Sequence, residues 1–98
     1  SIISKYNLPY QYTGDGSSWI GKINPDFAHN NNKKIAVDIF GDYWHSPLLR
    51  GIIRKEQQLQ FRTDYAKLQG WQLIIFWESE LKSQQAEQIV QRRLKNVV

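Results

Sequence analysis

Three side chains that could do chemistry lie between residues 24 and 45, where the surrounding sequence is largely apolar. Asp26 follows a proline at the start of a predicted strand, and Asp38 lies between two aliphatic residues in the most apolar strand. A carboxylate that is buried without a partner is costly, so each must be paired, hydrogen-bonded or metal-bound. Carboxylates on neighbouring strands could share Mg²⁺, completed by water and phosphate oxygens. His45 follows the end of the strand that contains Asp38, and histidine readily transfers a proton near neutral pH.

Each of these residues also has a purely structural interpretation. Asp26 could cap a turn or a helix after the proline, and Asp38 could face solvent at a sheet edge or pair with a lysine. A single histidine such as His45 is more often a hydrogen-bonded structural residue than a catalyst. The neighbouring Tyr43 and Trp44 are more often core residues than residues that read DNA. Taken singly, none of the five establishes a catalytic site.

The elements that position these residues can be predicted from periodicity and turn signals. Strands are expected at 10–13, 19–23, 34–40 and 71–77, a further strand begins at 26–28, and helices are expected at 51–69 and 83–95. Phe61, Tyr65 and Leu68 form an apolar stripe that should face the core. Residues 2–7 look like the last turn of a helix, which suggests a C-terminal fragment of a longer protein. We predict one α/β domain over residues 1–98, with a mixed central sheet of three to five strands flanked by helices.

Composition and charge limit the classes of protein. The chain of 98 residues has no cysteine, which excludes disulfides and thiolate zinc sites and favours an intracellular, cytoplasmic protein. No apolar run approaches the roughly 20 residues of a membrane span, so no membrane partner is expected. The net charge of +4 arises entirely in the half that begins at Arg50. A basic half suits a polyanionic partner, although a solvated basic face explains the charge equally well.

Three blocks of residues occur in an order that is typical of one enzyme family. They are Asn24-Pro25-Asp26-Phe27, then Phe40-Gly41-Asp42-Tyr43-Trp44-His45, then Gly70-Trp71 leading into Leu73-Ile74-Ile75-Phe76-Trp77-Glu78-Ser79-Glu80-Leu81. In these blocks the chain resembles the very-short-patch-repair (Vsr) endonucleases and the related EDxHD group of homing endonucleases from phage introns. The resemblance runs from Ile2 to Leu81 and implies a restriction-endonuclease-like (Vsr-like) fold.

The resemblance assigns roles to individual residues. Asp26 falls on the family's metal ligand, and a main-chain carbonyl near Ile39 would be the second protein ligand. His45 falls on the histidine that activates water or orients the scissile phosphate. Asp38 would serve as an outer-sphere or second-metal ligand. The implied cofactor is Mg²⁺ or another divalent cation.

DNA contacts are expected from two groups of residues. In the Vsr enzymes, aromatic residues beside the histidine wedge between base pairs, which makes Tyr43 and Trp44 candidates for DNA contact. Basic residues on or next to the predicted helix 51–69 would contact backbone phosphates, which hold position without reading sequence. These residues are Arg50, Arg54, Lys55, Arg62 and Lys67.

Three positions depart from the family's pattern. Phe40 replaces a lysine that the broader superfamily carries on the central strand, which fits the Vsr branch, where a histidine handles the proton. The family's first Glu would precede the first residue of this chain. Its last Asp should lie on the long helix, in a region that reads Gln57-Gln58-Leu59-Gln60. The nearest carboxylates, Glu56 and Asp64, are off register.

The resemblance implies a Mg²⁺-dependent DNA endonuclease, that is, a phosphodiester hydrolase that cuts double-stranded DNA. The chain would be the catalytic domain of a homing endonuclease in the cytoplasm of a bacterial host, with a phage as an alternative source of the gene. Such enzymes pair as dimers, so a homodimer of the full-length protein is expected. Two other interpretations are open. One is a nucleic-acid-binding module without catalysis, and the other is a structural domain that keeps the fold with an inactive site.

Overall fold

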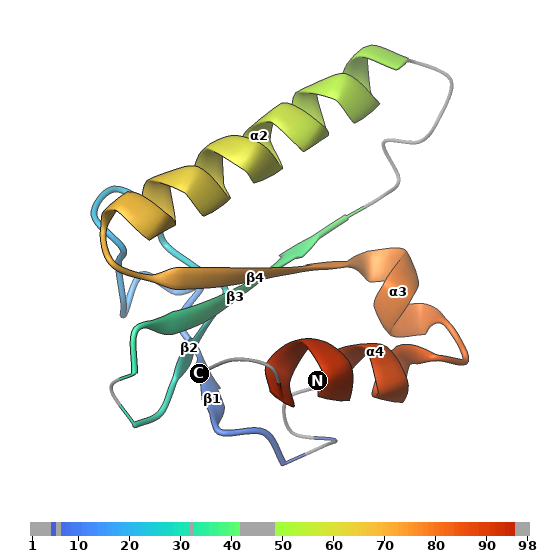
Figure 1. Ribbon diagram of the computed structural model, residues 1–98, viewed down its shortest axis with the longest axis horizontal. Coiled ribbons are helices and arrows are strands. Elements are labelled where there is room, and N and C mark those ends of the chain that lie inside the picture. The colour runs from blue at the N-terminus through green and yellow to red at the C-terminus, as the bar shows by residue number, and fades with distance from the viewer. Residues whose placement is uncertain (1–4, 6, 32, 42–48, 96–98) are drawn as a thin grey trace.

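The computed structural model describes residues 5, 7–31, 33–41 and 49–95, of which 49–57 and 95 are described by their backbone alone. The elements within these residues are β1 (Tyr10–Tyr12), β2 (Phe27–His29), β3 (Ile35–Phe40), α2 (Leu49–Leu68), β4 (Gln72–Trp77), α3 (Glu78–Lys82) and α4 (Ala86–Lys95), drawn in Figure 1. No helix in this part of the chain is long and apolar enough to cross a membrane.

The strands form one mixed sheet in the order β1-β2-β3-β4. The pairs β1–β2 and β2–β3 are antiparallel, whereas β3 and β4 run parallel. A parallel pair needs a long crossover connection, and α2 supplies it. β3 and β4 are rich in aliphatic and aromatic residues, which suit strands that are covered on both faces. The predicted α/β sheet of three to five strands with flanking helices is therefore confirmed.

Helices lie on both sides of the sheet, with α2 on one side and α4 on the other (Figure 1). The larger core contains Ile35 and Val37 of β3 together with Val90 of α4. The smaller core contains Ala36 and Ala66, which belong to β3 and α2. Because successive side chains of a strand point to opposite faces, the residue two positions after Ala36 also faces α2. That residue is Asp38, which forms an ion pair with Arg62 of α2.

The rotation of α2 about its axis differs from the prediction made from periodicity. Phe61 and Leu68 were expected to face the core, but they are 63% and 83% exposed, and Ala66 is buried instead. The small side chain of Ala66 lets the helix approach the sheet closely. One turn earlier on the same helix face, Arg62 reaches the buried Asp38. The expectation that the apolar stripe faces the core is therefore wrong, because an ion pair and a small residue set the rotation.

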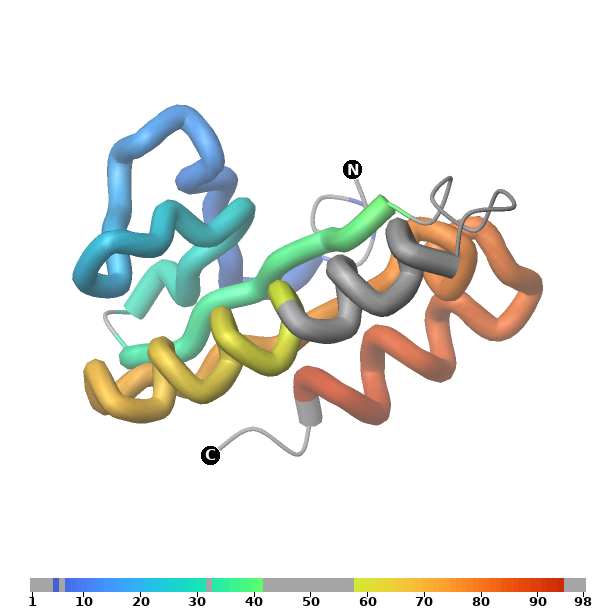
Figure 2. Tube along the Cα trace, turned by 90° about the horizontal axis from the view of Figure 1, so that it is seen from above, coloured from blue at the N-terminus to red at the C-terminus, as the bar shows by residue number. Residues whose placement is uncertain are grey.

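The segment 19–23 is a tight turn and not the predicted strand. Ile20 and Ile23 pair with each other through two backbone hydrogen bonds of 2.7 and 2.9 Å. Gly21 makes this turn possible because its φ of 57° lies in the left-handed region. Both isoleucines are buried as a result. Figure 2 shows the loop that carries this turn at the opposite end of the molecule from α3 and α4.

The C-terminal region contains two helices where one was predicted over 83–95. The first, α3, begins where the Trp77 N–H donates a hydrogen bond to Glu80 Oε1 at 2.9 Å. The second, α4, begins at Ala86. Arg93 of α4 forms an ion pair with Glu80 and donates a hydrogen bond to the Ile75 carbonyl at 3.0 Å. These contacts join α4 to α3 and to the sheet.

Replacing Gly21 with alanine should destabilise the protein by about 3 kcal/mol, because backbone strain and overpacking add. A Cβ at Gly21 would overlap the Tyr65 hydroxyl, which accepts a hydrogen bond from the Lys22 N–H at 3.0 Å. Gly70→Ala is the matched control, because Gly70 has a φ of 81° but open space around its Cβ. It should cost about 1 kcal/mol from strain alone. Urea unfolding measures both, and equal losses would contradict the close approach of Tyr65.

Candidate active site

The candidate site lies where β2 and β3 stop pairing. Continuation of their antiparallel register would place Asp26 opposite Asp38 and, one step further, Pro25 opposite Ile39. A proline has no backbone N–H, so a ladder hydrogen bond from this position is impossible. The β2–β3 ladder therefore ends after the pair of Phe27 and Val37. Beyond this pair, backbone N–H groups of both strands are free to bind side chains.

Two aspartate side chains bind backbone groups where the β2–β3 ladder ends. The Asp26 N–H donates to Asp38 Oδ1 at 3.0 Å, and the Ile39 N–H donates to Asp26 Oδ2 at 2.8 Å. Each carboxylate therefore binds the backbone of the opposite strand. This reciprocal arrangement fixes the orientation of both carboxylates and joins the two strand ends.

Asp38 is bound to an arginine from α2. Its Oδ2 accepts a hydrogen bond from Arg62 Nε at 2.8 Å and lies 2.7 Å from Arg62 Nη2. Asp38 is only 3% exposed, and the guanidinium compensates a buried charge that would otherwise be costly. The alternatives in which Asp38 faces solvent or pairs with a lysine are wrong. Arg62 is partly buried and bound to Asp38, and it also lines the cavity beside Asp26. Its contact with phosphates stays a prediction.

Asp26 keeps one carboxylate oxygen available for a ligand. Its Oδ2 is bound by Ile39, but no hydrogen bond reaches its Oδ1 from the described residues. Asp26 lines an open cavity of about 290 Å³. The other described residues that line this cavity are Asn24, Asp38, Ile39, Phe40, Gln58 and Arg62. A half-buried carboxylate that lines a cavity and has one oxygen bound to the backbone is suited to hold a cation or to move a proton.

The surroundings of Asp26 disfavour its charged form. Burial raises the pKa of Asp26 above the ordinary carboxyl value, and the charge of Asp38 raises it further. The hydrogen bond from the Ile39 N–H and the charge of Arg62 both lower this pKa, but they do not cancel the effect of burial. A divalent cation next to Asp26 would favour the charged form. Carboxylates shifted in this way, in a cavity, are enriched at functional sites.

The backbone of Ile39 offers a second oxygen at the same place. In an antiparallel ladder, the N–H and C=O of one residue point toward the same neighbouring strand. The Ile39 carbonyl therefore lies on the side where its N–H binds Asp26. Pro25, on the opposite strand, has no N–H to donate to it. Carboxylate and carbonyl oxygens are hard ligands of the type that Mg²⁺ accepts together with water.

The loop before β2 is fixed by side chains whose roles the sequence did not reveal. Asn24 Nδ2 donates hydrogen bonds to the Thr13 and Ser18 carbonyls, both at 2.7 Å. The buried Thr13 hydroxyl donates to the Pro25 carbonyl at 2.8 Å. These contacts hold the chain immediately before Asp26. The only sequence signal for them is an asparagine before a proline, which is typical of many turns.

Several predicted site residues cannot be placed beside Asp26. The block Tyr43-Trp44-His45 lies outside the described residues. The same holds for the side chains of Arg50, Arg54 and Lys55, whose backbone belongs to α2. Lys67 is exposed at the other end of α2 and lines a separate cavity with Lys33 and Lys34.

In the part of the chain that the structure describes, no group of three or more histidine, aspartate or glutamate side chains could hold a metal ion. A cation at Asp26 would therefore complete its coordination with the Ile39 carbonyl, water and substrate oxygens, as Mg²⁺ sites commonly do. The residues present fit such a cation, because they offer hard oxygen ligands and an open cavity.

The free energy of unfolding should depend on pH through Asp26. Because its pKa is higher in the folded protein, the folded state binds the proton more tightly. The tighter proton binding stabilises the folded protein in full at pH values below the ordinary carboxyl pKa. This stabilisation disappears as the pH rises through the raised pKa of the folded state. The stability of Asp26→Asn relative to wild type should therefore increase over that window. Urea unfolding of both proteins, without divalent cations, from about pH 3 to 7 measures this. A constant difference would contradict the raised pKa.

Comparison of the chain with models of protein families, with curated proteins and with solved structures found no match in any of the three. The functional interpretation therefore depends on the geometry around Asp26 and on the residue blocks of the sequence.

Proposed function

We propose that this chain is the catalytic domain of a metal-dependent DNA endonuclease with a Vsr-like fold, and that Asp26 holds its divalent cation, Mg²⁺. The orientation of Asp26 carries the proposal. Its Oδ2 is fixed by the Ile39 N–H, its Oδ1 accepts no hydrogen bond from the described residues, and Asp26 lines an open cavity. Such a site leaves room for water and for a phosphate oxygen, as metal-assisted phosphodiester hydrolysis requires. Double-stranded DNA is the substrate, and two copies of the domain would cut both strands.

The residues of the site take different parts in this reaction. When bound, the cation supplies Lewis acidity toward the scissile phosphate. Asp38 positions Asp26 by accepting its N–H, and Arg62 balances the charge of Asp38. Because both Asp38 oxygens already accept hydrogen bonds, positioning suits Asp38 better than binding a second metal. His45 accepts the proton of the attacking water, a role that rests on the resemblance alone.

Gln58 gives a test of where the cation lies. It lines the cavity beside Asp26 and belongs to the region of α2 where the family carries its last Asp. Gln58→Asp should tighten Mg²⁺ binding by about tenfold, because an added carboxylate strengthens a site for a hard cation. Gln88→Asp, at an exposed position of α4, is the matched control and should leave the affinity unchanged. Calorimetric titration with Mg²⁺ measures both, and an unchanged affinity of Gln58→Asp would place the cation elsewhere.

A nucleic-acid-binding module without catalysis is the second candidate, and the outer face of α2 favours it. Phe61 is 63% exposed and stacks on Tyr65, with ring centroids 6.0 Å apart. Lys67 lies exposed on the same helix. Exposed aromatic rings can stack on bases, and basic side chains of the same helix can contact phosphates, without any catalytic step.

Nicking of supercoiled plasmid DNA separates these two functions. The endonuclease proposal predicts conversion to nicked or linear DNA that requires Mg²⁺, stops with a chelator and is lost in Asp26→Asn and His45→Ala. The binding module predicts salt-dependent retention of DNA with the plasmid intact. Wild-type protein that binds the plasmid but leaves it intact in Mg²⁺ would overturn the endonuclease proposal.

A further inference from the structure

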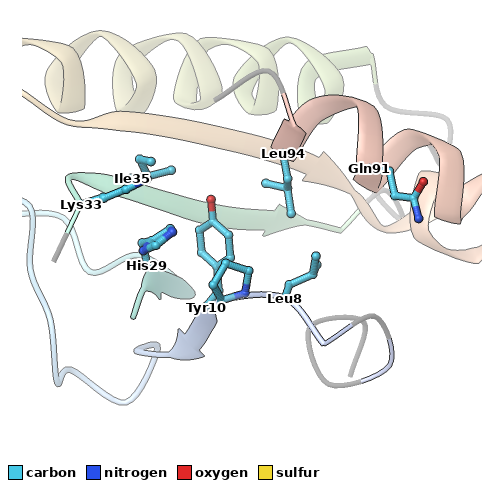
Figure 3. A pocket seen from close by; sticks show the side chains of 8 residues that line it. Leu8, Tyr10, His29, Lys33, Ile35, Gln91 and Leu94 are labelled. Carbon is cyan, nitrogen blue, oxygen red and sulfur yellow. The ribbon is translucent and has the colours of Figure 1, made fainter. Parts of the chain in front are cut away.

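A second cavity, of about 380 Å³, lies on the side of the sheet that α4 covers (Figure 3). Its apolar wall includes Leu8 before β1, Ile35 of β3 and Leu94 of α4. The volume is near the lower end of the roughly 300–1,000 Å³ typical of small-molecule sites. None of the residues that line the Asp26 cavity lines this one.

A buried hydroxyl without a partner points into this cavity. Tyr10 is only 6% exposed, and its hydroxyl has no hydrogen-bond partner among the described residues. Figure 3 shows the hydroxyl directed between Ile35 and Leu94. The Tyr10 ring itself is held edge-on against His29, with centroids 5.1 Å apart. The hydroxyl makes no hydrogen bond to the described residues, so it can donate one to a ligand in the cavity.

The other polar groups of the cavity make it electropositive. His29 Nδ1 accepts a hydrogen bond from the Asn31 N–H at 3.1 Å, which leaves the Nε2–H of the neutral ring as a donor. Burial and the charge of Lys33 both lower the pKa of His29, which favours that neutral form. Lys33 and Gln91 also line the cavity, where Lys33 contributes a positive charge and Gln91 contributes a side-chain amide. No aspartate or glutamate lines the cavity among the described residues.

We propose that this cavity binds a small organic monocarboxylate. The carboxylate accepts the hydrogen bond of the Tyr10 hydroxyl and is balanced by the charge of Lys33, while the apolar body of the ligand contacts Leu8, Ile35 and Leu94. One ammonium group balances one negative charge, which favours a carboxylate over a phosphate dianion. The apolar wall favours an aromatic or aliphatic body over a sugar. The inference is independent of the endonuclease proposal, because it uses other residues.

Titration of the ¹⁵N-labelled full chain with benzoate, followed by NMR, tests this proposal. For a ligand of this size we expect a Kd of about 1–10 mM, with saturable shifts at Tyr10, His29 and Lys33. Benzyl alcohol, which lacks the charge, should bind at least about tenfold more weakly. Titration with inorganic phosphate should give no saturable shifts of these signals. The absence of saturation by benzoate up to about 50 mM would overturn the proposal, and so would equal binding of benzyl alcohol or preferred binding of phosphate.

Two variants locate the site. Tyr10→Phe keeps the ring and should weaken benzoate binding about fivefold to tenfold, while the free protein stays folded because no hydrogen bond to the described residues is lost. Lys33→Gln should weaken binding about tenfold. Lys34→Gln is the matched control, since Lys34 does not line the cavity, and its affinity should equal that of wild type. Benzoate binding that is unchanged in both Tyr10→Phe and Lys33→Gln would overturn the proposal.

Discussion

The Asp26→Asn protein is expected to cleave DNA about 10³-fold more slowly than wild type, a loss of about 4 kcal/mol of transition-state stabilisation. Asparagine still accepts the hydrogen bond of the Ile39 N–H, so the strand ends stay joined. The substitution removes the negative charge that a divalent cation requires. Because burial disfavours the charge of Asp26, the variant should be at least as stable as wild type near neutral pH. Single-turnover plasmid cleavage and thermal unfolding measure the two effects.

Asp15→Asn is the control for this variant. Asp15 accepts a hydrogen bond from the Ser17 N–H at 3.0 Å in an exposed turn, and asparagine can replace it there. The same chemical change should therefore leave cleavage unaltered. Retention of more than about a tenth of wild-type activity by Asp26→Asn would show that its charge does not take part in catalysis.

Removal of the Asp38 carboxylate should lower both the stability and the activity of the protein. Asp38→Ala leaves Arg62 and the Asp26 N–H without their acceptor. Breaking a fully buried pair costs about 3–5 kcal/mol, and because the Arg62 side chain is 28% exposed, solvent should reduce the loss to about 2–3 kcal/mol. Cleavage should fall about 10- to 100-fold as well, since Asp26 loses the group that positions it. Urea unfolding and plasmid cleavage measure both losses.

A double mutant distinguishes the ion pair from a general loss of packing. Asp38→Leu together with Arg62→Met replaces both charges by apolar groups and should cost clearly less than the sum of the two single substitutions. The exposed pair of Lys82 and Glu78, 2.7 Å apart, serves as the reference. Glu78→Ala should cost at most about 0.5 kcal/mol. Additive losses at Asp38 and Arg62 would contradict a coupled pair.

The central strands could be predicted because their patterns are local. β3 and β4 are apolar at nearly every position, and the prediction of both strands, 34–40 and 71–77, is confirmed within one residue at each end. Because Asp38 lies between two aliphatic residues of such a strand, the sequence also indicated a buried carboxylate that needs a partner. The helix at 51–69 followed from the helical spacing of Phe61, Tyr65 and Leu68 and from Gly70, which ends it.

The packing of α2 could not be predicted, because it depends on contacts between residues far apart in the chain. Phe61 and Leu68 have helical spacing, so periodicity alone assigned them to the core. Arg62 binds Asp38 across 24 residues of sequence, and no local pattern encodes that pair. The site itself depends on where Pro25 falls in the β2–β3 register, which is fixed only when the strands pair.

Some of the candidate site came from the residue blocks and some from geometry alone. The Pro-Asp block singled out Asp26 before its contacts were known. The resemblance also pointed to the Ile39 carbonyl. The hydrogen bond that fixes Asp26 Oδ2 and the place of Gln58 in the cavity emerged from the fold. The contribution of His45 stays a prediction, because it rests on the Trp-His context and the residue lies outside the described part of the chain.

Paramagnetic broadening by Mn²⁺ tests most directly whether Asp26 holds a cation, since Mn²⁺ takes the same oxygen ligands as Mg²⁺. At substoichiometric Mn²⁺, the amide signals of Asp26 and Ile39 should broaden first, because the Ile39 N–H donates to the Asp26 carboxylate. Excess Mg²⁺ should reverse the broadening, and Asp26→Asn should abolish it. Broadening that spares these amides, or that persists unchanged in Asp26→Asn, would contradict a metal site at Asp26.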